Sequence, residues 1–112
     1  MSELQSANIQ LRVEAIKALL RNHPSILAQL LVEDESGINL NSTPDSMDLY
    51  NQEDILVRVA WDIWNGAGET EFHAVLHDLS MEDFDAFLEA MAKFKILRLK
   101  IHHLYASGAE DD

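Results

Sequence analysis

The chain has 112 residues, an apolar content of 47% and a formal net charge of −12 at pH 7. This length suits a single domain with a sizeable core and leaves no room for a second, so we expect residues 1–108 to form the domain and residues 109–112 an acidic flexible tail. The absence of cysteine excludes disulfides, thiolate metal sites and thiol nucleophiles. The first residues lack the features of a secretion signal, and no apolar run approaches the roughly 20 residues of a membrane span, so we expect a cytoplasmic protein.

The negative charge is concentrated in the middle of the sequence. Residues 1–32 sum to +1, residues 33–89 to −14, residues 90–108 to +4 and residues 109–112 to −3. Phosphate-binding surfaces need the opposite sign, so direct binding of nucleic acid is not expected. The short basic segment near the C-terminus is too small a patch to reverse this expectation.

Two helices are predicted in the first third of the chain. Residues 8–21 repeat apolar side chains at helical spacing. The pair His23-Pro24 ends this helix, because a residue that precedes proline avoids the α region. Pro24 then suits the first position of a second helix, 24–33, and we expect the two to form a helical hairpin.

The next segment, residues 34–50, is predicted to be a loop. It has no apolar periodicity and contains Gly37, Pro44 and several Asn, Asp and Ser residues. A connection of this length without regular structure is uncommon in a compact domain. It is therefore functional, partly mobile, or contains a short turn of helix near residues 46–49.

The stretch from Asn51 to Asn65 gives the clearest helix of the chain. Its apolar residues spread over roughly 240° of the helical wheel, which predicts a buried helix with neighbours on at least two sides. Asn51 can cap its start, and Asn65-Gly66 can end it. Trp61 and Trp64 are expected to belong to the core.

Two further helices are predicted, a short one at 71–79 and a long one at 81–106. Ser80 and Asp83 resemble a capping box at the start of the long helix. Acids precede bases along it, and this order suits the helix dipole. The alternative is a strand at residues 96–102, where apolar and polar side chains alternate; we favour the helix because no strong partner strand is evident.

Together these elements predict an all-α fold, a compact bundle of about five helices with a buried central helix (51–65) and a long C-terminal helix (81–106). We expect the first helical pair and the last helix to lie on either side of the central helix.

Sequence motifs for catalysis or metal binding are weak. His73 and His77 are four residues apart, as two zinc ligands on one helix would be, but a zinc-protease helix needs Glu where residue 74 is Ala. No third ligand is evident, and we interpret both histidines as solvent-facing. The chain has no carboxylate pair that the sequence places in an apolar pocket, so we predict no enzyme, no cofactor and no metal.

The specific features of the sequence concern surfaces, which favours a small acidic, non-catalytic protein-interaction or regulatory adaptor domain. The alternative is an acidic nucleic-acid mimic that inhibits a DNA- or RNA-binding protein, and it rests on the charge of residues 33–89. No membrane partner is expected.

Self-association is predicted through the end of the long helix. This helix would be about 38 Å long, so its distal part should project beyond the body and expose an apolar stripe. The stripe consists of Phe94, Leu97, Ile101, Leu104 and Tyr105. Its near-heptad spacing favours a second helix as partner, most simply the same helix of a second copy. An antiparallel arrangement would lay acids against bases, and we predict a homodimer through residues 94–105.

Overall fold

The chain folds into five helices. The computed structural model describes the backbone of residues 3–106 and the side chains of residues 5–103; the predicted acidic tail, 109–112, lies outside the described residues. The helices are α1 (Glu3–Leu19), α2 (Pro24–Leu30), α3 (Asn51–Asn65), α4 (Phe72–Asp78) and α5 (Met81–Ala106).

The predicted all-α class is confirmed. Within the described residues the only β pairing is an isolated antiparallel bridge between Leu31 and Ile38. Helix α5 continues through residues 96–102, so the alternative of a strand there is wrong. No helix in the described part of the chain is long and apolar enough to cross a membrane.

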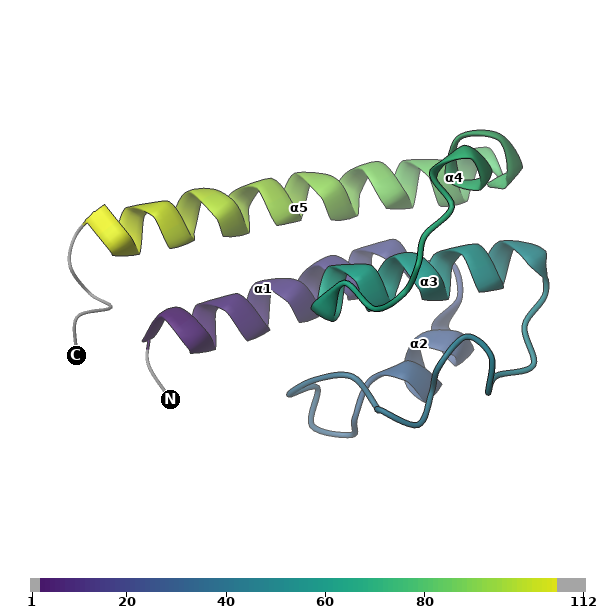
Figure 1. The fold of residues 1–112 in the computed structure, drawn as a ribbon, viewed down its shortest axis with the longest axis horizontal. Coiled ribbons are helices and arrows are strands. Elements are labelled where there is room, and N and C mark those ends of the chain that lie inside the picture. The colour runs from purple at the N-terminus through teal and green to yellow at the C-terminus, as the bar shows by residue number, and fades with distance from the viewer. Residues whose placement is uncertain (1–2, 107–112) are drawn as a thin grey trace.

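The long helices α1 and α5 run side by side in opposite directions (Figure 1). Helix α3 packs against α1 and is antiparallel to it, while α2 and the loop that follows it cover the side away from α5. Helix α1 therefore contacts both other long helices. The sequence had predicted this position, with neighbours on two sides, for α3. Helix α2 has only seven residues and ends at Leu30, before the predicted bound of 33, so the second arm of the predicted helical hairpin is short.

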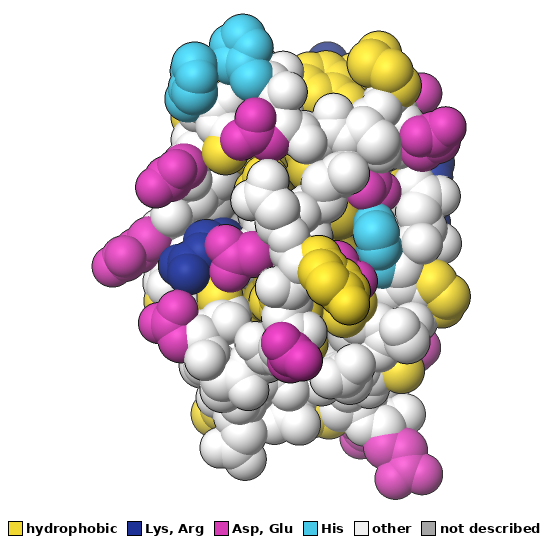
Figure 2. Space-filling model, turned by 90° about the vertical axis from the view of Figure 1, so that its right-hand side faces the viewer, with side chains coloured by type: hydrophobic (Ala, Val, Ile, Leu, Met, Phe, Trp, Pro, Cys, Tyr) yellow, Lys and Arg dark blue, Asp and Glu magenta, His cyan; other side chains and the backbone are white. Residues whose placement is uncertain are grey.

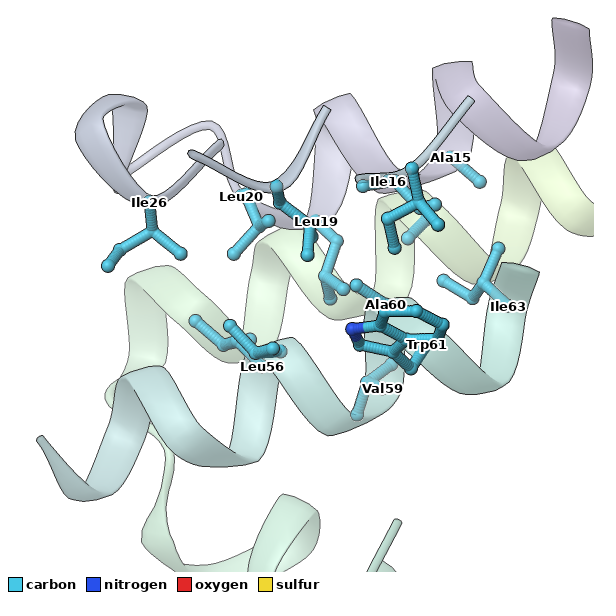
Figure 3. Packing of buried hydrophobic residues seen from close by; sticks show 14 of the residues in the cluster. Ala15, Ile16, Leu19, Leu20, Ile26, Leu56, Val59, Ala60, Trp61 and Ile63 are labelled. Carbon is cyan, nitrogen blue, oxygen red and sulfur yellow. The ribbon is translucent and has the colours of Figure 1, made fainter. Parts of the chain in front are cut away.

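The core forms where α3 meets α1 and α2. Figure 3 shows Leu19, the last residue of α1, and the following Leu20 directed toward Leu56 of α3, with Ile26 of α2 beside them. The buried residues of α3 are Ile55, Leu56, Val57, Val59, Ala60, Trp61 and Ile63. Seven buried residues in a helix of 15 confirm that this helix is the most deeply embedded stretch predicted from its wide apolar arc.

The loop between α2 and α3 is fastened to the core. The indole Nε1–H of Trp61, which is 6% exposed, donates to the carbonyl oxygen of Ser42 at 2.8 Å. Gly37 lies against Trp64, and a Cβ atom there would come 3.1 Å from Cη2 of the indole. Residues 46–49 form no helical turn; a hydrogen-bonded turn lies slightly earlier, at residues 44–46.

The ends of α3 follow local hydrogen bonds. The helix begins at Asn51 as predicted, but the preceding Tyr50 occupies the cap position and its N–H donates to Oε1 of Glu53 at 2.9 Å. At the other end Gly66 adopts a left-handed conformation with φ of +77°, and its N–H donates to the carbonyl oxygen of Asp62 at 3.1 Å. The predicted stop at Asn65-Gly66 is confirmed.

The carboxylate of Asp62 holds the turn that follows α3. It accepts the amide N–H of Gly68 at 2.8 Å and that of Thr70 at 2.7 Å, and also the Thr70 hydroxyl. Burial alone would raise the pKa of Asp62, but the hydrogen bonds from Thr70 and the neighbouring amides outweigh it and hold the pKa below the ordinary aspartate value. A Cβ atom on Gly68 would meet the carbonyl oxygen of Arg58 at 1.9 Å, so only glycine allows this approach.

Hydrogen bonds join the start of α5 to the connection between α1 and α2. The Asp83 amide donates to the Ser80 hydroxyl at 3.2 Å, which is one half of the predicted capping box. The Asp83 carboxylate does not complete the box. It accepts from Asn22 at 3.2 Å and lies 2.9 Å from Nε2 of His23. Among the described residues Asp83 is the only charged side chain that is buried, at 4% exposure.

Candidate protein-docking groove

A groove opens where α3 ends and its two neighbours continue. Figure 1 shows the C-terminal end of α3 stopping short of the end of the molecule at which α1 begins and α5 finishes. Two adjoining hollows lie there, of about 470 and 490 Å³. Side chains of α1 and α3 line the first hollow, which contains Gln5, Asn8, Ile9, Arg12 and Trp64. Side chains of α5 alone line the second, which contains Met91, Phe94, Lys95, Arg98, Leu99 and His102. We call the two hollows together the α5 groove.

Arg12 joins the three helices at the boundary between the two hollows. Its guanidinium donates to the carbonyl oxygen of Trp64 at 3.2 Å and to that of Ile63, at the end of α3. The guanidinium carbon lies 5.4 Å from the centroid of the Phe94 ring on α5, and Nε donates to the side chain of Asn8. Free carbonyl groups at a helix C-terminus and the face of an aromatic ring both attract a cation.

Burial lowers the pKa of Arg12 from its usual value, because the charged form loses hydration. The contacts just described replace part of that hydration. Arg12 therefore links α1, α3 and α5, a role that we call a structural clamp. Its positive charge contacts carbonyl oxygens and an aromatic ring of the same chain.

The α5 groove combines an apolar floor with a basic rim. Ile9, Trp64, Met91 and Phe94 are each partly buried and pack against the core. Leu99 at the edge is 61% exposed. The rim consists of Lys95, Arg98 and His102. These three side chains are exposed, and none takes part in an ion pair within the described residues.

The residues predicted to form the self-association stripe are divided by the structure. Phe94 lies in the floor of the α5 groove, and Ile101 is partly buried. Leu97 is 1% exposed, so its predicted exposure is wrong: α1 packs along α5 and covers the side on which Leu97 lies. The side chains of Leu104 and Tyr105 lie outside the described residues.

Sequence reasoning missed the residues that shape the α5 groove. Arg98 was not predicted to form part of a site, whereas it stands on the rim. The signal was present, because residues 91, 94, 95, 98 and 102 follow one another at helical steps along one side of α5. The contributions of Arg12 and Trp64 depend on where α3 ends relative to α1, and no sequence spacing reports that.

A third hollow, of about 340 Å³, lies between α3 and α4, outside the α5 groove, and is lined mainly by acidic side chains. Asp54, Glu69, Glu71 and Asp78 line it together with Arg58. Nε of Arg58 donates to Asp54, four residues earlier on α3, at 3.0 Å, and this hydrogen bond raises the pKa of Arg58. All four carboxylates are at least partly exposed, so none has the apolar enclosure that would make it a general acid.

The end of the molecule that carries α4 is acidic as a whole. Figure 2 looks onto this end and shows acidic side chains spread over it around one small basic cluster, with apolar side chains between them. The basic rim of the α5 groove lies at the opposite end of the long axis (Figure 1). Within the described residues, the acidic end and the basic rim therefore lie at opposite ends of the long axis.

His73 and His77 lie on the same side of α4, with ring centroids 4.4 Å apart. Both are exposed, as predicted. Within the described residues no group of three or more His, Cys, Asp or Glu side chains is placed to hold a metal ion.

Comparisons with known proteins find no matching family model, no matching curated protein and no matching solved structure. The function has to be argued from the geometry of the chain itself.

Proposed function

We propose that this chain is a non-catalytic protein-interaction domain, an adaptor that receives an amphipathic helix of a partner protein in the α5 groove. The observation that carries the proposal is the pairing of an apolar floor with a basic rim whose charges have no ion-pair partner within the described residues. In a protein with a net charge of −12, this surface differs from the rest of the molecule in both polarity and sign.

The shape of the α5 groove favours a helix as its occupant. From Met91 to His102 the groove extends about 16 Å along α5, which equals three turns of a helix. Helix-in-groove recognition uses apolar anchors on one side of the bound helix, spaced by three or four residues. Met91, Phe94 and Trp64 offer the apolar contact for such anchors.

The rim predicts the charge of that helix. Lys95 and Arg98 would meet acidic side chains that flank the apolar anchors, and such complementarity selects the partner and raises its association rate. The acidic side chains around α4 would also repel an acidic segment, while the basic rim at the opposite end of the long axis would attract it. The proposed partner is therefore an acidic amphipathic helix.

A second candidate is the acidic nucleic-acid mimic, and the acidic end that carries α4 favours it (Figure 2). A mimic would place that end in the basic cleft of a DNA- or RNA-binding protein. The two proposals use opposite ends of the molecule, so variants at each end separate them.

The proposal is tested by affinity purification from a native lysate with matched charge reversals. Arg98 and Lys100 are exposed basic residues on the same part of α5, but only Arg98 lines the α5 groove. A partner that docks there should be lost with Arg98→Glu and retained with Lys100→Glu. Retention of the partner by Arg98→Glu contradicts the proposal.

The mimic makes the opposite prediction for the same captured protein. Its binding would be displaced by duplex DNA or RNA, would fall steeply with salt, and would be lost with Glu71→Lys while Arg98→Glu left it intact. A partner in the α5 groove would be less sensitive to salt, because much of its contact is apolar.

A further inference from the structure

Helix α5 is apolar on two opposite sides. The buried side holds Ala86, Ala90 and Leu97. The opposite side carries large apolar residues that face solvent: Met81 (73% exposed), Leu88 (50%), Ile96 (55%) and Leu99 (61%). A helix that covered only its own monomer would carry polar residues there.

These exposed residues are aligned. At about 100° per residue, the four of them and the exposed Ala92 fall within an arc of about 80°, roughly opposite the buried side. From Met81 to Leu99 they form a stripe about 27 Å long, which we call the outer stripe; the exposed Asp85 interrupts it between Met81 and Leu88. Single exposed apolar residues are ordinary on a protein surface, but an aligned stripe over five turns normally marks an interface.

The charges along α5 are ordered so that a second copy complements them. Glu82 and Asp85 lie in its first two turns, whereas Lys95 and Lys100 lie in its second half. All four are exposed, and none forms an ion pair within the described residues. Acids at one end and bases at the other complement the same helix only when the two run antiparallel.

We propose that two copies of this chain associate through the outer stripe, with their α5 helices antiparallel around a two-fold axis at Ala92. Ala92 lies midway between Leu88 and Ile96, so Leu88 of each copy faces Ile96 of the other. The same register brings Glu82 within about one turn of the second copy's Lys100. A small residue on the axis lets the two helices approach closely.

A second copy fits better than an unrelated helix because the surface is self-complementary. A two-fold interface requires that one patch match itself, and about Ala92 the central apolar residues Leu88 and Ile96 and the acidic and basic halves of α5 meet this condition. A parallel pair would instead place Glu82 and Asp85 beside the same acids of the second copy.

This interface revises the predicted homodimer. The predicted stripe ran through Leu97, which α1 covers in the monomer. The outer stripe uses the other side of the same helix. It overlaps the proposed partner site at Leu99 and Lys95, whereas Leu88, Ala92 and Ile96 do not line the α5 groove.

The first experiment measures mass by light scattering during gel filtration at micromolar concentrations. The wild-type chain should have twice the monomer mass of 12.7 kDa. Ile96→Asp should return the mass to that of the monomer without loss of helical circular dichroism, because Ile96 is 55% exposed and supports little of the monomer core. Arg98→Glu, which changes the α5 groove alone, should leave the dimer intact.

The second experiment tests the position of the axis. The chain has no cysteine, so Ala92→Cys introduces a single thiol. On the two-fold axis of a closely packed helix pair the two thiols fall within disulfide range, and mild oxidation should give a covalent dimer. Ala28→Cys, at an exposed alanine on α2, is the matched control and should stay monomeric under denaturing electrophoresis.

Three results would overturn this proposal: a wild-type mass of 12.7 kDa, a dimer that survives Ile96→Asp, or equal cross-linking at residues 92 and 28. A monomeric wild type whose captured partner is released by Ile96→Asp assigns the outer stripe to another protein and rejects the second copy. None of these results bears on the α5 groove, whose own test is Arg98→Glu.

Discussion

Nε2 of His23 lies 3.0 and 2.9 Å from the two carboxylate oxygens of Asp83. This contact joins the residue before α2 to the first turn of α5, across 60 positions of the sequence. It gives the only buried charge among the described side chains a partner on each oxygen. The antiparallel packing of α1 and α5 is therefore fixed at one end by a buried polar contact.

His23→Ala should destabilise the fold by about 1–3 kcal/mol, because it leaves a buried carboxylate short of a partner. Arg21→Ala is the comparison, since the Arg21–Glu89 pair also joins the connection between α1 and α2 to α5, but on the exposed surface, and should contribute less than about 1 kcal/mol. Urea unfolding followed by tryptophan fluorescence gives both values. An equal or larger effect at Arg21 would contradict the assignment.

Arg12→Lys should destabilise the fold although it keeps the positive charge. An ammonium group cannot reproduce the planar fork that reaches the carbonyl oxygens at the end of α3 while facing the Phe94 ring. We expect a loss of about 1–3 kcal/mol in urea unfolding. Lys17→Arg, at a surface position on the same helix, should change the free energy of unfolding little, and a similar loss in both variants would argue against the clamp.

Asp62→Asn should lower the melting temperature at pH 7 but not in acid. The pKa of Asp62 is lowered in the folded state, so its carboxylate stabilises the fold above the unfolded-state pKa of about 3.9, and this contribution disappears as pH falls through the folded value. Melts of wild type and variant should therefore begin to converge below about pH 3.9 and coincide once the pH is below the folded-state pKa. The exposed Asp48→Asn serves as control, and a difference between wild type and Asp62→Asn that persists in acid would exclude the linkage.

The two glycines after α3 should differ in their response to alanine. The Cβ atom of Gly66→Ala would meet open space, so only the left-handed backbone conformation should destabilise this variant, by about 1–2 kcal/mol. Gly68→Ala should cost more, because its Cβ would overlap the Arg58 carbonyl and the backbone has to move. Thermal melts of the two variants rank them, and the reverse order would show that the turn rearranges freely.

Local signals in the sequence predicted the elements well. The bounds 51–65 and 81–106 agree with α3 and α5, because a left-handed glycine, a serine cap and a sustained apolar period are each encoded within a few residues. The start of α1 at Glu3 and the early end of α2 at Leu30 were not predicted. At the end of α2 no glycine or asparagine marks the stop, and Leu31 is already extended.

The tertiary relations were harder to predict. Whether Leu97 or Leu99 faces solvent depends on which side of α5 meets α1, and an apolar pattern on both sides of a helix does not choose between them. The α5 groove depends on three helix ends meeting in space. The sequence does not determine which residues in the C-terminal half of α5 face outward.

The central claim, that the α5 groove is the docking site, is tested most directly by NMR of the domain with its captured partner. The two indole N–H resonances report on different places. Trp64 lines the groove, whereas the Trp61 indole N–H is hydrogen-bonded to the Ser42 carbonyl oxygen, away from the groove. Binding should shift the Trp64 indole and the amides of residues 91–102 and leave the Trp61 indole unmoved. Shifts confined to residues 69–78, with the Trp64 indole unchanged, would contradict the claim and place the partner at the acidic end.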